Sequence, residues 1–143
     1  MLSSDQKGVI AELEIARQAA ELGIGVWTAH TIERYDLIFD LRPKLVRVQC
    51  KWSRQDGDVI VVRCLCNRRS RRGLLRRPYS AEEIDAFAAY CPDTNRCYFL
   101  PLDVFAHRSA IQLRTGPTRN NQAARVNWAS DFEFAATLGL AGP

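Results

Sequence analysis

The segment from Val46 to Trp52 alternates strictly between apolar and polar residues, and this pattern constrains the fold more than any other feature of the chain. The apolar members are Val46, Val48, Cys50 and Trp52, and the polar members between them are Arg47, Gln49 and Lys51. Successive side chains of a β-strand point to opposite faces of a sheet. The alternation therefore predicts a strand whose apolar face packs on a helix and whose polar face is open to solvent or to chemistry.

A helix and a series of strands are predicted around this segment. Ser3 and Gln6 have the spacing of a capping box, and Gly23 suits the position after a helix, where a positive φ costs least. These signals predict a helix over residues 5–22. Further β-rich runs cover residues 25–31, 35–41 and 59–66. Together with residues 44–52 they predict an antiparallel meander at the start of a mixed sheet.

The apolar stripe of the predicted helix indicates which of its residues face the protein. At about 100° per residue, one face gathers Val9, Leu13, Ala16 and Ala20. We expect this face to pack on the rest of the chain. Glu12 falls at the edge of the stripe, whereas Glu14 points toward solvent. Of the two acids, Glu12 is the one expected to approach the strands.

The second half of the chain predicts one more helix and further strands. Ser80 and Glu83 form a capping box for a helix over residues 82–91, which Pro92 ends. Residues 96–101 are predicted as a fifth strand, and the order strand–helix–strand allows parallel pairing through a right-handed crossover. The rest is predicted to hold a strand near Ile111–Arg114, a polar loop over 118–122, and a terminal strand or short helix containing Trp128, Phe132 and Phe134. The expected fold class is α/β.

Length and composition fit one domain over residues 1–143. The chain is 47% hydrophobic and 25% charged, as in folded globular proteins. It has no apolar run of about 18 residues that would cross a membrane, and MLSSDQKG lacks a signal-peptide pattern, so we expect a cytoplasmic protein. Its five cysteines show no paired CxxC spacing. We expect reduced core thiols, without a zinc site.

Positive charge is concentrated in one short segment. The formal net charge is +4. Between residues 68 and 77 lie six arginines: Arg68, Arg69, Arg71, Arg72, Arg76 and Arg77. Their mutual repulsion favours a bound polyanion, so nucleic acid is the expected partner, against the alternative of a solvated loop.

Three polar residues have the arrangement that phosphodiester hydrolysis requires. Such a reaction needs charge neutralisation at phosphorus, an activated water and a stabilised leaving oxygen, which a hard divalent cation with oxygen ligands can supply. An acid on one strand and polar residues at i and i+2 on its neighbour would form a suitable concavity. Asp36, Gln49 and Lys51 meet this description if the runs 35–41 and 44–52 pair.

These residues also carry a resemblance to a known family. The segments GVIAELEIARQAAELG, YDLI and VQCKW resemble, in that order, the helix-borne Glu, the strand-borne Asp and the (D/E)-x-K motif of the PD-(D/E)XK nuclease superfamily. The Q-x-K form, with YSAEEIDAFAAYCPDTNRCYFLP and the later LR, NNQ and W segments, resembles group I intron homing endonucleases and their bacterial relatives. The resemblance implies a single-domain restriction-endonuclease-like fold, with a mixed central sheet flanked by helices.

The resemblance implies a role for each motif residue. Asp36 would be the central metal-binding carboxylate, and Glu12 a further acid reaching in from the helix. Gln49 would hold the place of Asp or Glu as a neutral oxygen ligand, and the backbone carbonyl of Cys50 would be another. Lys51 would orient the attacking water and stabilise transition-state charge. The implied cofactor is Mg²⁺, with Mn²⁺ as an alternative, and Gln49 implies weaker metal binding because it removes one negative charge.

DNA contacts and assembly complete the sequence-based expectations. Besides the arginine cluster, the candidates for contact are Arg54, Arg119, Asn120, Asn121 and Gln122. One domain carries one active site while a duplex has two strands, so we expect a homo-oligomer, dimer or tetramer, with C-terminal hydrophobic residues at the interface. Two alternatives to an endonuclease acting on double-stranded DNA remain: a Holliday-junction-resolving nuclease, and a DNA-binding module that has lost catalysis through Gln49.

Overall fold

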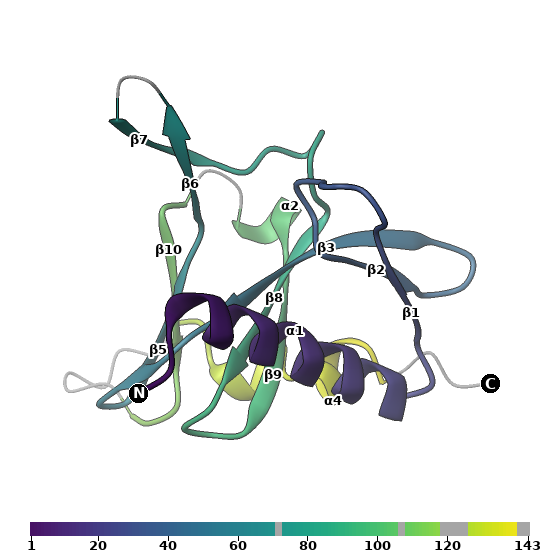
Figure 1. Ribbon diagram of the computed structural model, residues 1–143. Helices are drawn as coiled ribbons and strands as arrows, with labels where there is room; N and C mark the ends of the chain where they lie inside the picture. The colour runs from purple at the N-terminus through teal and green to yellow at the C-terminus, as the bar shows by residue number, and fades with distance from the viewer. Residues whose placement is uncertain (71–72, 106–107, 118–125, 140–143) are drawn as a thin grey trace.

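The computed structural model describes residues 1–70, 73–105, 108–117 and 126–139, with the backbone alone for 66–70 and 73–77 (Figure 1). Its central sheet has the strand order β1-β2-β3-β8-β9. The bounds are Gly25–Thr28 for β1, Leu37–Asp40 for β2, Leu45–Trp52 for β3, Ala86–Cys91 for β8 and Arg96–Pro101 for β9. The first three strands form the predicted antiparallel meander, β3 and β8 are parallel, and β8 and β9 are antiparallel. The mixed sheet expected from the sequence is confirmed.

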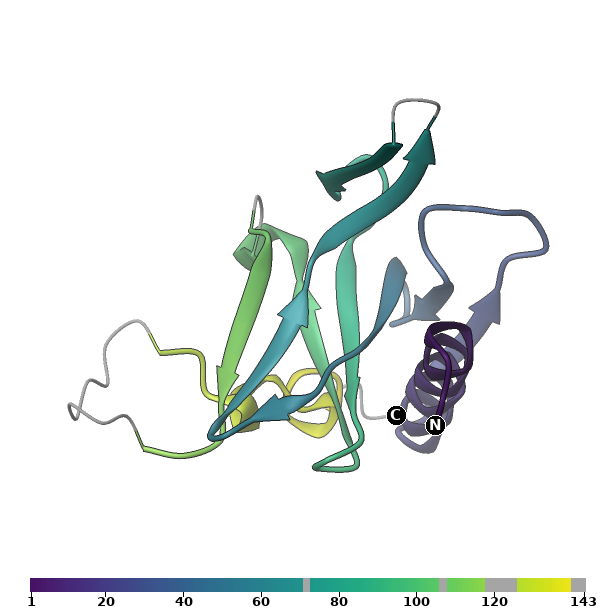
Figure 2. The same cartoon turned by 60° about the vertical axis from the view of Figure 1, so that its left-hand side comes forward.

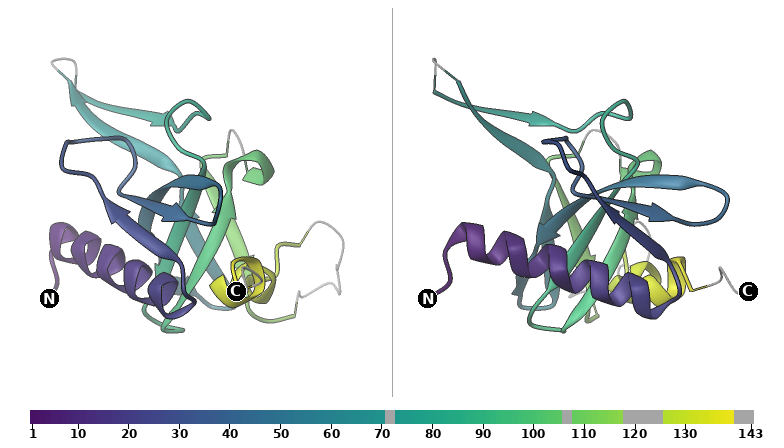
Figure 3. Two further views of the ribbon diagram at one scale, coloured as in Figure 1. Left: turned by 90° about the vertical axis from the view of Figure 1, so that its right-hand side faces the viewer. Right: turned by 45° about the vertical axis from the view of Figure 1, so that its right-hand side comes forward.

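Helix α1 spans Ser4–Glu21 and crosses one face of this sheet (Figures 1 and 3). The predicted capping box is present: Ser3 Oγ accepts from the Gln6 amide at 3.2 Å, and Gln6 Oε1 accepts from the Ser3 amide at 2.8 Å. Gly23 has the expected positive φ, +83°. The helix therefore begins and ends close to the predicted positions.

The buried face of α1 differs from the predicted one. Ala11, Ile15 and Ala19 are at most 1% exposed, whereas Val9 and Leu13 are 58% and 65% exposed. Ala11, Ile15 and Ala19 form a second apolar stripe at i, i+4 and i+8, so the helix has two apolar stripes with the same periodicity. The prediction of the Val9 and Leu13 face is wrong because periodicity alone does not decide which of two such stripes packs on the sheet. Glu12 is half-buried beside Ala11 at the edge of the true buried stripe.

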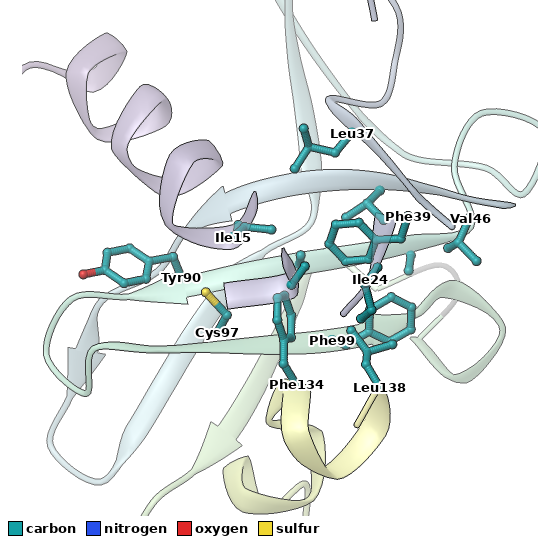
Figure 4. Packing of buried hydrophobic residues seen from close by; sticks show 14 of the residues in the cluster. Ile15, Ile24, Leu37, Phe39, Val46, Tyr90, Cys97, Phe99, Phe134 and Leu138 are labelled. Carbon is teal, nitrogen blue, oxygen red and sulfur yellow. The ribbon is translucent and has the colours of Figure 1, made fainter. Parts of the chain in front are cut away.

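A first hydrophobic cluster fills the space between α1 and the sheet (Figure 4). Phe39 of β2 stacks on Phe99 of β9 at 6.4 Å between ring centroids, and Phe134 meets Phe39 edge-on at 6.0 Å. Val46 and Val48 of β3 belong to this cluster. The apolar face of the alternating strand thus packs on a helix, as predicted.

A second cluster lies on the opposite face of β8 and β9. It is covered by a three-stranded sheet of order β10-β5-β4 and by helix α2, Leu102–Phe105 (Figure 2). These strands span Ala110–Arg114 for β10, Val59–Arg63 for β5 and Gln55–Asp56 for β4. The strand near residue 111 is confirmed. The fourth predicted run does not extend the meander, because β5 pairs with β10 and β4.

The predicted helix over residues 82–91 is wrong, because β8 occupies its second half. Ser80 and Glu83 do form the local turn, with the Ser80 amide donating to Glu83 Oε1 at 3.2 Å. All six residues of β8 are buried, with alternate ones entering the two clusters. A continuous apolar run suits a strand covered on both faces as well as a buried helix. Residues 96–101 form a strand as predicted, but it pairs antiparallel with β8 and the parallel pair is β3 with β8.

Two short helices close the described chain, α3 over Ala129–Phe132 and α4 over Phe134–Thr137. Phe134 and Leu138 are buried in the first cluster, so these C-terminal hydrophobic residues are not on an external interface. Cys50, Cys64, Cys91 and Cys97 are free thiols, as expected. No helix within the described ranges has the length and hydropathy needed to cross a membrane.

Candidate functional site

The predicted site residues meet where β3 extends past β2. In the described residues, β2 pairs with the first half of β3, from Leu45 to Val48. Just before β2, the Asp36 amide donates to the Val48 carbonyl at 2.9 Å. The Asp36 carboxylate then accepts from the Cys50 amide at 2.9 Å. The second half of β3 thus presents its edge to a carboxylate.

Strand geometry places further oxygen and nitrogen atoms around Asp36. The N–H and C=O of one residue in a strand point to the same edge, so the Cys50 carbonyl points to the edge at which its N–H meets Asp36. Gln49 and Lys51 project from the polar face of β3, level with Phe87 and Ala89 of β8. The pairing expected from the sequence therefore brings Asp36, Gln49, Cys50 and Lys51 together.

Glu12 approaches the same place from α1. Burial, and then the negative charge of Asp36, raise the pKa of the Glu12 carboxyl above its ordinary value. Glu14 is instead hydrogen bonded by Arg17, with Arg17 Nη2 at 2.8 Å from its Oε2, and this contact lowers its pKa. Both helix acids are partly buried, and Glu12 is the one whose pKa is raised by Asp36.

The electrostatics at Asp36 favour the arrival of a positive charge. Burial raises the pKa of the Asp36 carboxyl, against smaller lowering effects from the Cys50 amide and the Lys51 ammonium. Burial and then the charges of Asp36 and Glu12 raise the pKa of the Cys50 thiol well above its usual range. Two nearby carboxylates with raised pKa values are a place where a cation lowers the energy of the ionised forms.

The donor set fits a hard cation. Within the part of the chain that the structure describes, no group of three or more His, Cys, Asp or Glu side chains gathers as a metal site. The residues that could hold a cation here are Asp36 and Glu12, through carboxylate oxygens, and Gln49 and Cys50, through neutral oxygens. Oxygen ligands of this kind suit Mg²⁺ or Mn²⁺, whereas zinc sites use nitrogen and sulfur.

Sequence reasoning missed a clamp on the same polar face of β3. The Arg47 guanidinium donates to Asp85 Oδ2 at 3.1 Å and Oδ1 at 3.1 Å, to the Glu82 carbonyl at 2.6 Å and to the Ala81 carbonyl at 2.8 Å. The Arg47 amide also donates to Asp85 Oδ2, at 2.8 Å. The position of Arg47, two and four residues before Gln49 and Lys51, was the available signal. Its contacts fix the segment that follows the arginine cluster.

A second missed feature is the environment of Lys51. Its Nζ lies over the Tyr79 ring, 5.1 Å from the centroid, and the Arg34 guanidinium carbon lies over the same ring at 4.6 Å. Arg34 forms an ion pair with Glu83. The sequence holds no spacing that would have brought Tyr79 to Lys51, because the contact joins segments 28 positions apart by way of a strand pairing.

The predicted DNA-contact residues lie on an antiparallel hairpin and beyond it. Strands β6, Leu65–Ser70, and β7, Gly73–Pro78, form a ribbon that projects from the rest of the protein (Figures 2 and 3). Its backbone carries Arg68, Arg69, Arg76 and Arg77. Arg71, Arg72, Arg119, Asn120, Asn121 and Gln122 lie outside the described residues. Arg54 is exposed and paired with Asp93, with Nε 3.0 Å from Oδ2.

Comparisons with known proteins bear on the family and the fold. A profile of the PD-(D/E)XK endonuclease family matches residues 2–135. A solved structure of a bacterial homing endonuclease, I-Ssp6803I, is similar, with a TM-score of 0.73 and 29% sequence identity over 94% of this chain and 90% of that one. No curated protein matches the sequence. The two matches confirm the resemblance that the ordered motifs indicated.

Proposed function

We propose that this chain, which belongs to the PD-(D/E)XK endonuclease family, is a divalent-metal-dependent endonuclease that hydrolyses phosphodiester bonds in double-stranded DNA. Family membership and the likeness to a homing endonuclease support nuclease activity. The observation that carries the proposal is the meeting of Asp36 with the Cys50 amide at the free edge of β3, beside Lys51 and within the electrostatic reach of Glu12.

The proposed metal ligands are Asp36, Glu12, the Gln49 side-chain oxygen and the Cys50 carbonyl. Nucleases of this family generally use divalent metals, and the all-oxygen donor set favours Mg²⁺, with Mn²⁺ as a substitute. When bound, the ion supplies charge neutralisation at the scissile phosphate and activation of water. Two carboxylates leave the site less negative than one with a third acid at position 49, so we expect metal binding to be weak.

The protein side chains have separate tasks in this proposal. The Asp36 carboxylate is held at the strand edge by the Cys50 amide, which donates to Oδ2, and Oδ1 is the oxygen proposed to bind the cation. Lys51 places an ammonium on the polar face of β3, where it stabilises negative charge on a phosphate oxygen and orients the attacking water.

The arginine hairpin β6–β7 is the proposed DNA-contact surface. A two-stranded β-ribbon fits the major groove of B-form DNA, and arginine can pair with phosphates or with guanine edges. Its projection from the body supports this role (Figure 2). We propose additional contacts by Arg54 and by residues 119–122, and recognition of a specific site.

Cutting both strands requires two active sites. We propose that residues 1–143 form one nuclease domain and that the chain acts as a homo-oligomer, dimer or tetramer, in the cytoplasm. Strands β8 and β9 contribute to both hydrophobic clusters, which supports one folding unit.

A cleavage assay tests the proposal. The protein is incubated with a mixed linear DNA library in Mg²⁺, Mn²⁺ or EDTA, and with a four-way junction of the same composition. We expect cutting of linear duplex with either metal and none in EDTA. Preferential cutting of the junction would instead identify a junction-resolving nuclease. DNA binding that weakens with salt, with no cutting under any condition, would identify a binding module.

The three lysines of the chain provide a matched pair of variants for the same assay. Lys51→Met removes the ammonium but keeps an apolar stem, and we expect cleavage to fall by about 10²–10³-fold. Lys44→Met makes the same change on the loop between β2 and β3, and we expect wild-type cleavage. Equal cleavage activity in both variants would show that Lys51 has no catalytic role.

A further inference from the structure

Tyr79 stands between the arginine hairpin and the proposed active site. It directly follows β7, which ends at Pro78. Its side chain is 8% exposed, and its ring lies under the Lys51 ammonium, with 5.1 Å from Nζ to the ring centroid. An ammonium within about 6 Å of an aromatic centroid is attracted by the negative face of the ring. The ring thus contacts the one lysine that the proposed mechanism uses.

The Tyr79 ring is held by its neighbours. Phe87 of β8 packs edge-on against it, with 5.4 Å between centroids and 83° between planes. The backbone that follows is fixed by the Arg47 clamp at Ala81 and Glu82. An aromatic ring immobilised in this way can define the position of a flexible four-carbon side chain.

The charges around the ring permit it to hold Lys51. Arg34 also lies over the ring, at 4.6 Å from the centroid, and two cations at one ring repel each other. Glu83 forms an ion pair with Arg34, which offsets that repulsion. The Lys51 ammonium therefore lies over the Tyr79 ring and is still close enough to Asp36 to lower the pKa of its carboxyl.

We propose that Tyr79 is a positioning residue for Lys51, and that its ring face, rather than its hydroxyl, holds the ammonium where the phosphate is cut. This inference rests on the proposed function. Tyr79 directly follows the last residue of β7, and its ring contacts Lys51 on the polar face of β3. One residue therefore connects the arginine hairpin to the lysine.

Cleavage kinetics of three variants test the proposal. Tyr79→Leu removes the ring, and we expect kcat to fall about tenfold with little change in KM for DNA, since an attraction of this size is lost at the chemical step alone. Tyr79→Phe keeps the ring, and we expect it to restore kcat. Phe105→Leu removes a buried ring from the same cluster away from Lys51, and we expect a lower Tm with unchanged kcat.

A spectroscopic measurement on the wild-type protein needs no destabilised variant. Only three lysines are present, so the Lys51 side-chain signals can be assigned by their loss in Lys51→Met. We expect the Lys51 ε-methylene protons to be shifted upfield of those of Lys7 and Lys44 by the Tyr79 ring. The shift should persist in Tyr79→Phe.

The outcomes separate this inference from the function on which it rests. A wild-type protein that cuts no DNA overturns the proposed function and the role of Tyr79 with it. If the wild type cuts, the inference alone is overturned by any of three results: equal kcat in Tyr79→Leu, an equal loss in Tyr79→Phe, or Lys51 signals without an upfield shift.

Discussion

The two ends of β3 use the same hydrogen bond for opposite purposes. Near the start of the strand, the Arg47 amide donates to the Asp85 carboxylate at 2.8 Å. Near its end, the Cys50 amide donates to the Asp36 carboxylate at 2.9 Å. Each aspartate thus accepts a hydrogen bond from a backbone N–H of β3. The aspartates themselves lie outside the paired strands.

The surroundings of the two carboxylates differ in charge. The Arg47 guanidinium lowers the pKa of Asp85, against a smaller raising effect of burial. At Asp36, burial has the largest effect and raises the pKa. The positive charge of Arg47 therefore balances the negative charge of Asp85. Asp36 instead lies near a second acid, Glu12, so a further positive charge is favourable beside it. One hydrogen-bond pattern thus occurs in a structural clamp at one end and in the proposed cation site at the other.

The largest effect is expected from a substitution of Asp36, at the second end of β3. Asp36→Asn retains an oxygen to accept from Cys50 but removes the negative charge, and we expect cleavage to fall by about 10³-fold or more. Because the fold raises the pKa of Asp36, ionising this carboxyl costs more free energy in the folded chain than in the unfolded chain, so Tm should equal or exceed that of the wild type. Cleavage rates and thermal denaturation check both results. A variant that cuts normally would contradict the assignment of Asp36.

The next largest effect is expected from the same Asp-to-Asn substitution at Asp85, near the start of β3. Asp85→Asn weakens the pairing with Arg47, and we expect the free energy of unfolding to fall by about 1–2 kcal/mol and Tm by about 2–8 °C. Cleavage by the folded protein should be retained. Urea denaturation and cleavage at a temperature well below Tm measure the two quantities. Loss of cleavage with unchanged stability would reverse the roles assigned to the two ends.

A substitution at Gln49 increases the difference in negative charge between the two ends of β3. Gln49→Glu restores the carboxylate expected at this position in the family and adds a negative charge beside Asp36. We expect the Mg²⁺ concentration for half-maximal cleavage to fall about tenfold. Arg47 and Asp85 are left unchanged, so the clamp provides an internal control. An unaltered Mg²⁺ midpoint would show that residue 49 lies outside the metal site.

The smallest expected effect is a pH dependence of opposite sign at the two ends. The stabilisation that Asp85 provides is present above its ordinary pKa and is lost as pH falls through its lowered folded value. The stabilisation from Asp36 is present in its protonated form and is lost as pH rises through its raised folded value. Relative to the wild type, Asp85→Asn should be less stable and Asp36→Asn equally or more stable at about pH 7, with both differences shrinking toward about pH 3. Differential scanning calorimetry at the two pH values tests this; differences that grow on acidification would contradict it.

Short-range patterns predicted the strand pairing that places Asp36 beside the second half of β3. Asp36, Gln49 and Lys51 meet because two neighbouring strands pair antiparallel, and alternation in β3 determines which side chains share a face. Glu12 was identified by its place at the edge of a helix stripe, although the stripe chosen was the exposed one. Glu12 follows Ala11, which is buried. It therefore lies close to the strands even though the apolar face chosen from the sequence was the exposed one.

Long-range contacts account for what the sequence did not predict. Residues 82–91 carry a capping signal and an apolar run compatible with a helix, and only their burial between two layers makes residues 86–91 a strand. Asp85, which directly precedes β8, reaches β3 beside that pairing, and the Tyr79 ring lies near Lys51 and Arg34, from segments far apart in the sequence. Their roles follow from tertiary contacts that no local spacing encodes.

The hydrogen bond between Asp36 and Cys50 has a consequence for solubility. An unpaired strand edge presents backbone N–H and C=O groups to which another chain can add a strand, and inward-pointing charged residues prevent such pairing. At the end of β3, the Asp36 carboxylate occupies the Cys50 N–H and places a negative charge where an incoming backbone would lie. We therefore expect the proposed metal ligand also to hinder edge-to-edge addition of another chain, an effect that Asp36→Ala would remove and Asp36→Asn would keep in part.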